Sequence, residues 1–187
     1  QRALVVRQFS GSPVAVSMEW GLRPNWAKAP KARPQINARS ETVCEKPMFR
    51  KAIRRQRCLI LCDGYFEWQK GSSKSKQPYY IHGPGRTPFV LAGIWSTNKN
   101  LTGEDASSFV VLTTDSDDSV SHIHHRMPIR VETGMQAPWL DPQLTGTKDI
   151  EKLISGCKGL WESYQISAYV NNPGNNTSRC IARENLR

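Results

Sequence analysis

The chain has 187 residues, of which 38% are hydrophobic, so it is long enough to form a domain with a substantial hydrophobic core. No apolar run approaches the roughly 18 residues of a membrane-spanning helix, and we expect no membrane partner. Lys and Arg (26) exceed Asp and Glu (16) by ten, a surplus typical of proteins that bind a polyanion, most often nucleic acid. A basic protein without such a partner is the alternative interpretation.

The first 34 residues combine a hairpin pattern with an irregular basic stretch. Apolar runs at residues 3–6 and 14–18 flank the turn sequence Ser-Gly-Ser-Pro at 10–13, which predicts two paired strands. Residues 19–34 are rich in Pro, Lys and Trp and do not fit a regular element. Trp26 lies there beside lysines, where it either stacks on a base or pins the loop to the core.

Residues 40–53 predict a helix, which begins either at the N-cap Ser40 or near Pro47. Arg50, Arg54 and Arg57 would share one face, which either is solvated or contacts phosphates. Alternating basic and aromatic residues are typical of grooves that hold single-stranded nucleic acid. The basic groups lie at residues 28–33, 50–57 and 70–76, and the aromatic residues near them are Trp26, Phe49, Tyr65, Phe66 and Trp68.

A buried strand is expected at residues 58–62, and Asp63-Gly64 predicts a turn before a second strand at 65–68. Glu67 lies between two large aromatic residues of this second strand. It is a candidate for general acid–base work, although strand alternation would equally place it in water, opposite a buried Phe66.

Many short strands and a few short helices predict an α+β fold with a mainly antiparallel, barrel-like sheet. No repeat or linker divides the chain, so we expect a single domain over residues 1–187. The remaining strands are expected at 78–82, 88–95, 109–114 and 165–170, and helical segments at 134–140 and 149–156.

Three of the four histidines lie in one segment, which reads Ser121-His122-Ile123-His124-His125-Arg126-Met127-Pro128. Imidazole titrates near neutrality, so the cluster is a candidate for proton transfer, for metal binding or for simple loop packing. The segment follows the strand expected at 109–114, and loops that leave a rigid strand commonly carry catalytic groups.

The five cysteines are an odd number and include no Cys-x-x-Cys pair, which favours a reducing compartment, either nuclear or cytoplasmic. A zinc site from Cys62 with the histidines is conceivable, but the spacing matches no standard ligand pattern. We therefore expect neither a metal nor a cofactor.

Five distinct segments of the chain match motifs of a known family in the same order. They are Trp20-Gly21-Leu22-x-Pro24-x-Trp26, Ile36-Asn37-Ala38-Arg39-Ser40-Glu41, Asp63-Gly64-Tyr65-Phe66-Glu67-Trp68, Ile123-His124-His125-Arg126-Met127-Pro128 and Val170-Asn171-Asn172. In order and approximate spacing they resemble the SRAP (SOS-response-associated peptidase) family, and the likeness covers nearly the whole chain.

This resemblance implies a sensor and shield of abasic sites in single-stranded DNA that crosslinks itself to the lesion. Family members begin Met-Cys-Gly-Arg, and autoproteolytic removal of the methionine exposes a cysteine whose amine and thiol close a thiazolidine with the abasic sugar. An α-amine with a pKa of about 7.7–8.0 is substantially neutral, hence nucleophilic, at physiological pH.

The resemblance also implies roles for individual residues. Asn37 would orient the cysteine and the sugar, Glu67 would shuttle protons, and His124 would act as a general acid in opening the sugar ring. Two further sets would bind DNA. Arg39, Arg126 and Thr113 would contact phosphates, and Trp26, Met48 and Phe49 would wedge or stack against bases.

The match has two departures. No cysteine precedes Cys44, so we expect residues 1–187 to lack a native N-terminal segment that carries the nucleophile. His122 stands where many relatives have an acidic residue. The alternatives are a reversible binder of single-stranded or modified DNA and a cysteine peptidase that acts on other proteins. We expect a monomer, with replication-fork proteins as further partners.

Overall fold

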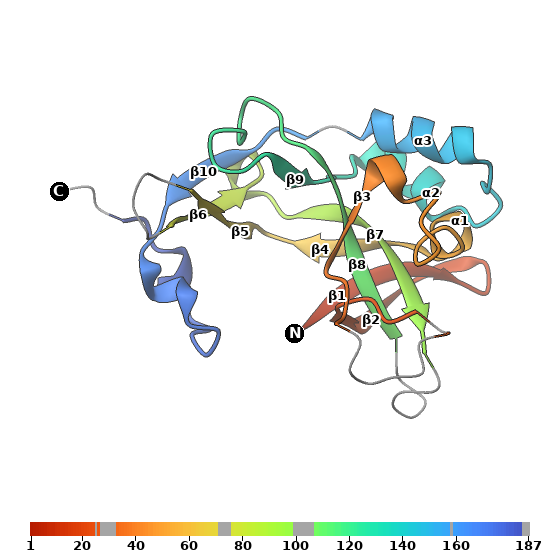
Figure 1. Ribbon diagram of the computed structural model, residues 1–187, viewed down its shortest axis with the longest axis horizontal. Coiled ribbons are helices and arrows are strands. Elements are labelled where there is room, and N and C mark those ends of the chain that lie inside the picture. Colours follow the sequence, from red (N-terminus) through yellow and green to blue (C-terminus); the bar gives the residue numbers. More distant parts are fainter. Residues whose placement is uncertain (25, 27–32, 71–75, 99–106, 158, 185–187) are drawn as a thin grey trace. The chain divides into compact units, whose positions relative to one another are not determined.

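The computed structural model describes residues 1–187 except 25, 27–32, 71–75, 99–106, 158 and 185–187 (Figure 1). The chain folds into two compact units, each built from three stretches of sequence. The first unit comprises Gln1–Leu61, Phe89–Thr114 and Pro128–Gly159, and the second comprises Cys62–Pro88, Asp115–Met127 and Leu160–Arg187. A single domain over residues 1–187 stays a prediction.

The first unit is built on a ring-like sheet. Its strands run in the order β2-β1-β4-β7-β8-β3, and a parallel pairing of β2 with β8 connects the path back on itself. The neighbouring strands β1 and β2, β1 and β4, and β7 and β8 are antiparallel, which agrees with the expected mainly antiparallel sheet. The bounds are β1 (Arg2–Phe9), β2 (Ser12–Trp20), β3 (Asn37–Arg39), β4 (Arg57–Cys62), β7 (Phe89–Thr97) and β8 (Ser107–Asp115).

The hairpin predicted at the N-terminus is confirmed by the full register of β1 and β2, from Arg2 opposite Glu19 to Phe9 opposite Ser12. The turn between them has positive φ angles at Ser10 (49°) and Gly11 (83°). Two consecutive positive φ angles match the twist of paired strands, and a glycine at the second position adopts such an angle at little cost.

Three helices pack against the first unit's apolar core, namely α1 (Ala52–Arg55), α2 (Thr133–Leu140) and α3 (Thr147–Gly156). Trp139 of α2 is fully buried, and its indole N–H donates to the carbonyl of Cys58 at 2.9 Å. The helix expected over 40–53 is wrong in extent. Only a 3-10 turn at Ser40–Thr42 and the short α1 are helical, because Pro47 interrupts the segment between them.

Arg57 lies in β4 and not on a helix, which corrects the expected basic face of Arg50, Arg54 and Arg57. It is 3% exposed, and its guanidinium donates to the backbone carbonyls of Ile53, Arg54, Trp139 and Asp141. Burial lowers the pKa of this guanidinium, and Asp141 acts in the opposite direction. Its charge therefore ties α1 and the end of α2 to the sheet.

The second unit contains a three-stranded antiparallel sheet in the order β10-β6-β5. Its strands are β5 (Tyr65–Gln69), β6 (Gln77–His82) and β10 (Glu162–Gln165), and 3-10 turns lie at Pro84–Arg86, Ala168–Asn171 and Ser178–Ile181. The last predicted strand, 165–170, is therefore largely wrong, because the chain turns after Ile166.

The chain bends at Asp63, where a turn was expected, but the two strands that flank this bend do not pair with each other. β4 belongs to the first sheet and β5 pairs with β6 in the second. A Cβ atom at Gly64 would lie 2.2 Å from the ring of Tyr80, so the close approach of backbone and ring excludes any larger residue.

No helix in the described part of the chain combines the length and the hydropathy required to cross a bilayer.

Replacing Arg57 with Met should lower the free energy of unfolding by about 3 kcal/mol, because four backbone carbonyls, two of them in buried hydrogen bonds, would lose their donor. Urea denaturation measures this loss. Arg55→Ala, at an exposed position of α1, is the matched control and should stay within about 0.5 kcal/mol of the parent. Equal stability of Arg57→Met and the parent would contradict the proposed tie.

Candidate functional site

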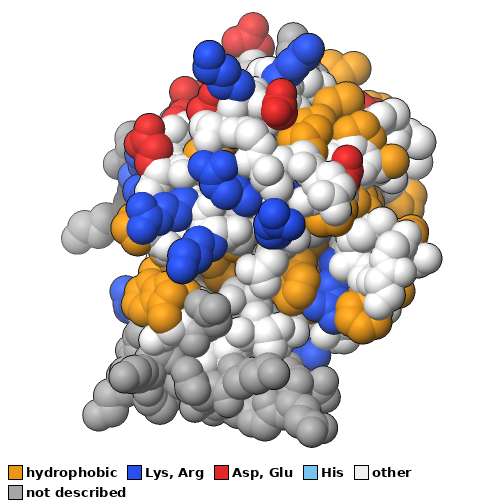
Figure 2. Space-filling view, turned by 90° about the vertical axis from the view of Figure 1, so that its right-hand side faces the viewer, with side chains coloured by type: hydrophobic (Ala, Val, Ile, Leu, Met, Phe, Trp, Pro, Cys, Tyr) orange, Lys and Arg blue, Asp and Glu red, His pale blue; other side chains and the backbone are white. Residues whose placement is uncertain are grey.

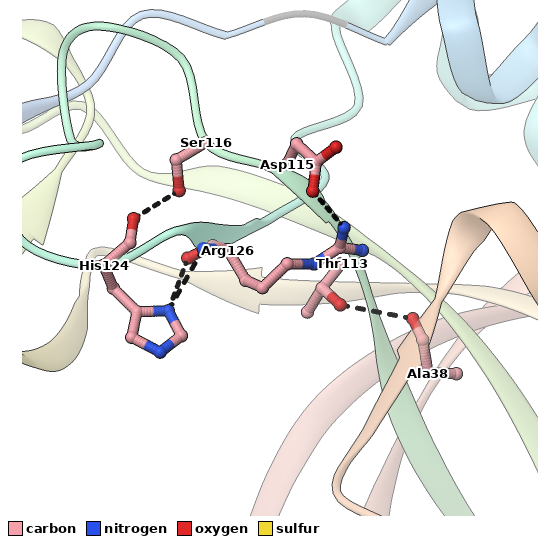
Figure 3. A network of polar contacts seen from close by, with 6 residues as sticks. All are labelled: Ala38, Thr113, Asp115, Ser116, His124 and Arg126. Carbon is pink, nitrogen blue, oxygen red and sulfur yellow. Dashed lines mark hydrogen bonds and ion pairs between the residues drawn. The ribbon is translucent and has the colours of Figure 1, made fainter.

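Strand β3 presents two of the predicted site residues on one face of the first unit. Its burial alternates, with Asn37 and Arg39 exposed and Ala38 buried, so the side chains of Asn37 and Arg39 point to the same side. β3 pairs in parallel with β8, and Arg39 lies opposite Thr113. The hydroxyl of Thr113 donates to the carbonyl of Ala38 at 3.5 Å (Figure 3).

The Trp20-Gly21-Leu22 segment holds the chain that enters β3. The indole of Trp20 donates to the carbonyl of Ile36 at 2.8 Å, and Leu22 exchanges backbone hydrogen bonds with Gln35. Gly21 has a φ of 128°, and a Cβ atom there would lie 2.8 Å from the Cβ atom of Pro34. Only glycine fits where the backbone at residue 21 passes Pro34. The glycine of the Trp20-Gly21-Leu22 motif therefore has a structural role and not a chemical one.

The three expected stacking residues differ in exposure. Trp26 is 58% exposed, which favours a free ring over one pinned to the core. Met48 is partly buried against the core, and Phe49 is 5% exposed inside it. In this structure the ring of Phe49 packs against protein, so stacking on a base would require it to leave the core.

The histidine segment of the second unit is a tight turn with specific backbone anchors (Figure 3). Ile123 is 4% exposed and fixes the middle of the segment, while His124 donates its N–H to the carbonyl of Val120 at 3.2 Å. Ser116 binds the segment twice, because its hydroxyl donates to the carbonyl of His124 at 2.7 Å and its N–H to the carbonyl of His125 at 3.1 Å.

The imidazole of His124 is placed for proton transfer. Its Nδ1 lies 3.1 Å from both the backbone N–H and the carbonyl oxygen of Arg126, and 3.8 Å from Oε2 of Glu67. When Nδ1 accepts the N–H of Arg126, the neutral ring carries its proton on Nε2. Nε2 points away from Arg126 in Figure 3.

Glu67 is neither fully solvated nor buried, since its side chain is 27% exposed. Its Oε1 accepts the backbone N–H of Trp68 at 3.0 Å, which leaves Oε2 directed to His124. The indole of Trp68 in turn donates to Oδ1 of Asn171 at 2.7 Å. This bond joins the Asp-Gly-Tyr-Phe-Glu-Trp and Val-Asn-Asn segments. The sequence places both segments among the family motifs but does not predict that they are in contact.

Arg126 forms an ion pair with Asp115 at 2.6 Å (Figure 3). The arginine side chain is 12% exposed and the aspartate side chain 84% exposed. Sequence reasoning missed Asp115. Because this carboxylate occupies the guanidinium, a phosphate that binds Arg126 has to compete with it or join it.

Tyr65 adds a neutral hydroxyl to this unit, and its oxygen is buried. Burial raises the pKa of the Tyr65 hydroxyl, and the nearby charges of Glu67 and Asp117 raise it further. The hydroxyl therefore keeps its proton at physiological pH.

The sequence-predicted residues thus form two sets. The first unit brings together Asn37, Arg39 and Thr113, and the second unit brings together Glu67, His124 and Arg126. Within the described residues, no group of three or more His, Cys, Asp or Glu side chains is arranged to hold a metal ion.

Several basic side chains of the first unit are exposed. Figure 2 shows Lys and Arg side chains gathered on one face, with hydrophobic side chains beside them. Exposed basic residues of the first unit include Lys46, Arg50, Lys51 and Arg55. Such a face suits contacts with phosphates.

Comparison with known proteins is consistent across three kinds of match. Residues 1–173 match the model of the SOS response associated peptidase (SRAP) family. The chain is 35% identical over 173 residues to abasic site processing protein YoaM of Bacillus subtilis, covering 90% of this chain and 75% of that relative. It is 34% identical over 198 residues to abasic site processing protein HMCES of Xenopus tropicalis, covering 92% and 58% respectively.

Solved structures share the fold of this chain. A protein from Bacteroides thetaiotaomicron superposes with a TM-score of 0.79 at 28% identity, over 98% of this chain and 82% of its own. A phage-related protein from Bordetella bronchiseptica gives a TM-score of 0.70 at 25% identity, over 88% and 78%. The match of the family model over residues 1–173 and the 35% identity to YoaM show that the chain belongs to the SRAP family.

Proposed function

We propose that this protein processes abasic sites in single-stranded DNA by forming a covalent crosslink with the open-chain sugar. The observation that carries the proposal is the pairing of His124 with Glu67 at 3.8 Å, beside Arg126, in a chain whose relatives are named abasic site processing proteins. An abasic sugar offers an aldehyde when its ring opens, and proton transfer limits both ring opening and imine formation.

The nucleophile in this proposal is an N-terminal cysteine in a segment before Gln1, as the family resemblance implies. Its α-amine adds to the aldehyde carbon, and loss of one water gives an imine. The thiol sulfur then adds to the imine carbon while the nitrogen takes up the thiol proton, which closes a thiazolidine. The net change is the aldehyde plus the aminothiol giving the ring plus water.

His124 and Glu67 divide the proton transfers. Protonated on both nitrogens, His124 directs Nδ1 to the carbonyl of Arg126 at 3.1 Å and to the carboxylate of Glu67 at 3.8 Å. It donates its Nε2 proton to the sugar ring oxygen as the ring opens, which leaves a neutral imidazole. Glu67, held by the N–H of Trp68, accepts a proton from the attacking amine and returns it to the departing hydroxyl. The same carboxylate would assist removal of the initiator methionine.

Asn37 and Arg39 suit contacts with the DNA because both project from the exposed face of β3. We propose that Asn37 orients the sugar and the amine, and that Arg39 and Arg126 bind the flanking phosphates, with Thr113 in a lesser role. Trp26, with 58% of its surface exposed, is the strongest of the proposed stacking residues.

The alternative of a peptidase that uses an internal cysteine is disfavoured by thiol chemistry. Burial raises the pKa of the thiols of Cys44 and Cys58, of Cys157 to about 11 and of Cys62 to about 12. Cys180 is 6% exposed. A thiol protonated at physiological pH is a weak nucleophile, so none of the four thiols with a raised pKa is prepared for attack on a peptide.

Full-length protein that carries the N-terminal cysteine should form a heat-stable adduct with single-stranded DNA containing one abasic site. Denaturing gel electrophoresis measures this adduct. Replacing the N-terminal cysteine with Ser should abolish it. Tight, salt-sensitive but fully reversible binding would instead establish the non-covalent alternative and overturn the proposal.

Glu67→Gln and His124→Ala should each slow adduct formation by about 10²- to 10⁴-fold, because each removes a proton-transfer group. Single-turnover gel kinetics give the rate. Glu151→Gln, at an exposed position of α3, is the matched control for loss of a carboxylate and should react at the parental rate. Parental rates in both site variants would remove these residues from the mechanism.

Arg39→Ala should weaken binding to undamaged single-stranded DNA and make the salt dependence shallower, by about 0.7 in the slope of log K against log salt for each lost phosphate contact. Fluorescence anisotropy at several salt concentrations measures both quantities. Lys148→Ala, on the exposed surface of α3, should keep the parental slope. An unchanged slope in Arg39→Ala would contradict a phosphate contact.

Thiol labelling resolved by residue should show that Cys62 and Cys157 are unreactive. With pKa values of about 11 for Cys157 and about 12 for Cys62 against 9.0 for a free thiol, the thiolate fraction at pH 7 is lower by about 100-fold and about 1,000-fold. Labelling of native protein should therefore keep rising about tenfold per pH unit through pH 9, whereas urea-unfolded protein should level off there. An early plateau in native protein would contradict the raised pKa values.

A further inference from the structure

The sheet of the second unit has one apolar and one polar face. Directly opposed residues of antiparallel strands project to the same side, and Phe66, Tyr80 and Tyr164 are opposed across β5, β6 and β10. Together with Ile166 these aromatic rings form an apolar cluster. The opposite face must then carry the intervening residues.

That polar face carries Glu67, Tyr79 and Gln165, which are opposed across the same three strands. Gln69 follows Glu67 by two residues on β5 and therefore projects to the same side. On this face the proposed proton-transfer carboxylate thus lies between Tyr65 and Gln69 along the strand.

A chain of side-chain hydrogen bonds crosses this face and ends on the histidine segment. The amide of Gln165 donates to the hydroxyl of Tyr79 at 2.9 Å, and that hydroxyl donates to Oε1 of Gln69 at 3.3 Å. The amide of Gln69 then donates to the backbone carbonyl of His122 at 2.7 Å. The ring of Tyr79 also meets the ring of His122 edge-on, at 6.1 Å between centroids.

The direction of every hydrogen bond in this chain is determined. Tyr79 accepts from Gln165 and so has its own proton for Gln69, whose oxygen accepts it and whose nitrogen is left to donate to His122. Only an amide of this length both accepts and donates in that order. A carboxylate in its place would set an acceptor against the carbonyl of His122.

We propose that Gln69 is a positioning residue that holds the histidine segment so that His124 sits against Glu67. Gln69 acts through the backbone of the segment, at the carbonyl of His122. It holds one end of the segment at His122, while Ser116 holds the other at the carbonyls of His124 and His125. Since a 1 Å displacement of a catalytic group costs up to about 10²-fold in rate, this clamp has a kinetic consequence. This role rests on the proposed crosslinking function.

The test compares Gln69→Glu with Gln8→Glu, a substitution with the same change of charge on β1 of the first unit. Gln69→Glu should slow adduct formation by about 10- to 100-fold and change the shape of its pH–rate profile, with the affinity for undamaged single-stranded DNA unchanged. Tyr79→Phe, which keeps the ring contact with His122 but removes the relaying hydroxyl, should give a smaller loss of the same kind. Gln8→Glu should match the parent in all three measurements.

Hydrogen exchange at the amide of Ser116, which donates to the carbonyl of His125, reports the histidine segment without any reaction. Its protection should fall in Gln69→Glu and persist in Gln8→Glu. The proposed clamp is overturned if the parent forms the adduct and both Gln69→Glu and Tyr79→Phe keep its rate, its pH–rate profile and its protection at Ser116. If the parent forms no adduct, the proposed function fails, and the clamp is decided by the exchange of Ser116 alone. If Gln69→Glu does not fold, Tyr79→Phe decides between the same outcomes.

Discussion

The two-residue alternation of β5 is the constraint on which the proposed chemistry depends. Successive side chains of a strand must project to opposite faces, so a strand that buries Phe66 against Tyr80 and Tyr164 has to turn Glu67 to the other side. The apolar cluster therefore fixes where the carboxylate goes. Its burial free energy holds the strand in register, and one step of slippage would exchange the aromatic ring for the carboxylate.

The same constraint acts on β3, where burial of Ala38 leaves Asn37 and Arg39 on an exposed face. The crossing at Gly21, which admits no side chain, and the bond from Trp20 to Ile36 fix the chain that enters this strand. In both units the candidate site residues are thus placed by the packing of their neighbours. Their motifs contain both candidate site residues and residues that pack the fold, and only the three-dimensional geometry distinguishes the two kinds.

Net charge overstates the positive surface that is free to meet a polyanion. Arg57 is consumed by backbone carbonyls, Arg126 is paired with Asp115, and Arg7 stacks on the ring of Trp95 at 4.2 Å. These guanidinium groups stabilise the fold or are already paired with a carboxylate. The exposed basic residues near α1 and Arg39 on β3 are better placed for phosphates, because they are exposed to solvent.

Sequence by itself determined the α+β class, most strand positions, the N-terminal hairpin and the identity of Glu67 and His124 as acid–base candidates. These features depend on local alternation, on turn residues and on motifs, each of which involves residues that are close together in the sequence. Only the tertiary structure decided that Phe49 lies in the core, that Arg57 is buried, that Asp115 pairs with Arg126 and that Gln69 reaches the histidine segment. The physical reason is that each of these contacts joins residues brought together by strand register and chain crossing, and register is set by the packing of whole faces rather than by any local pattern.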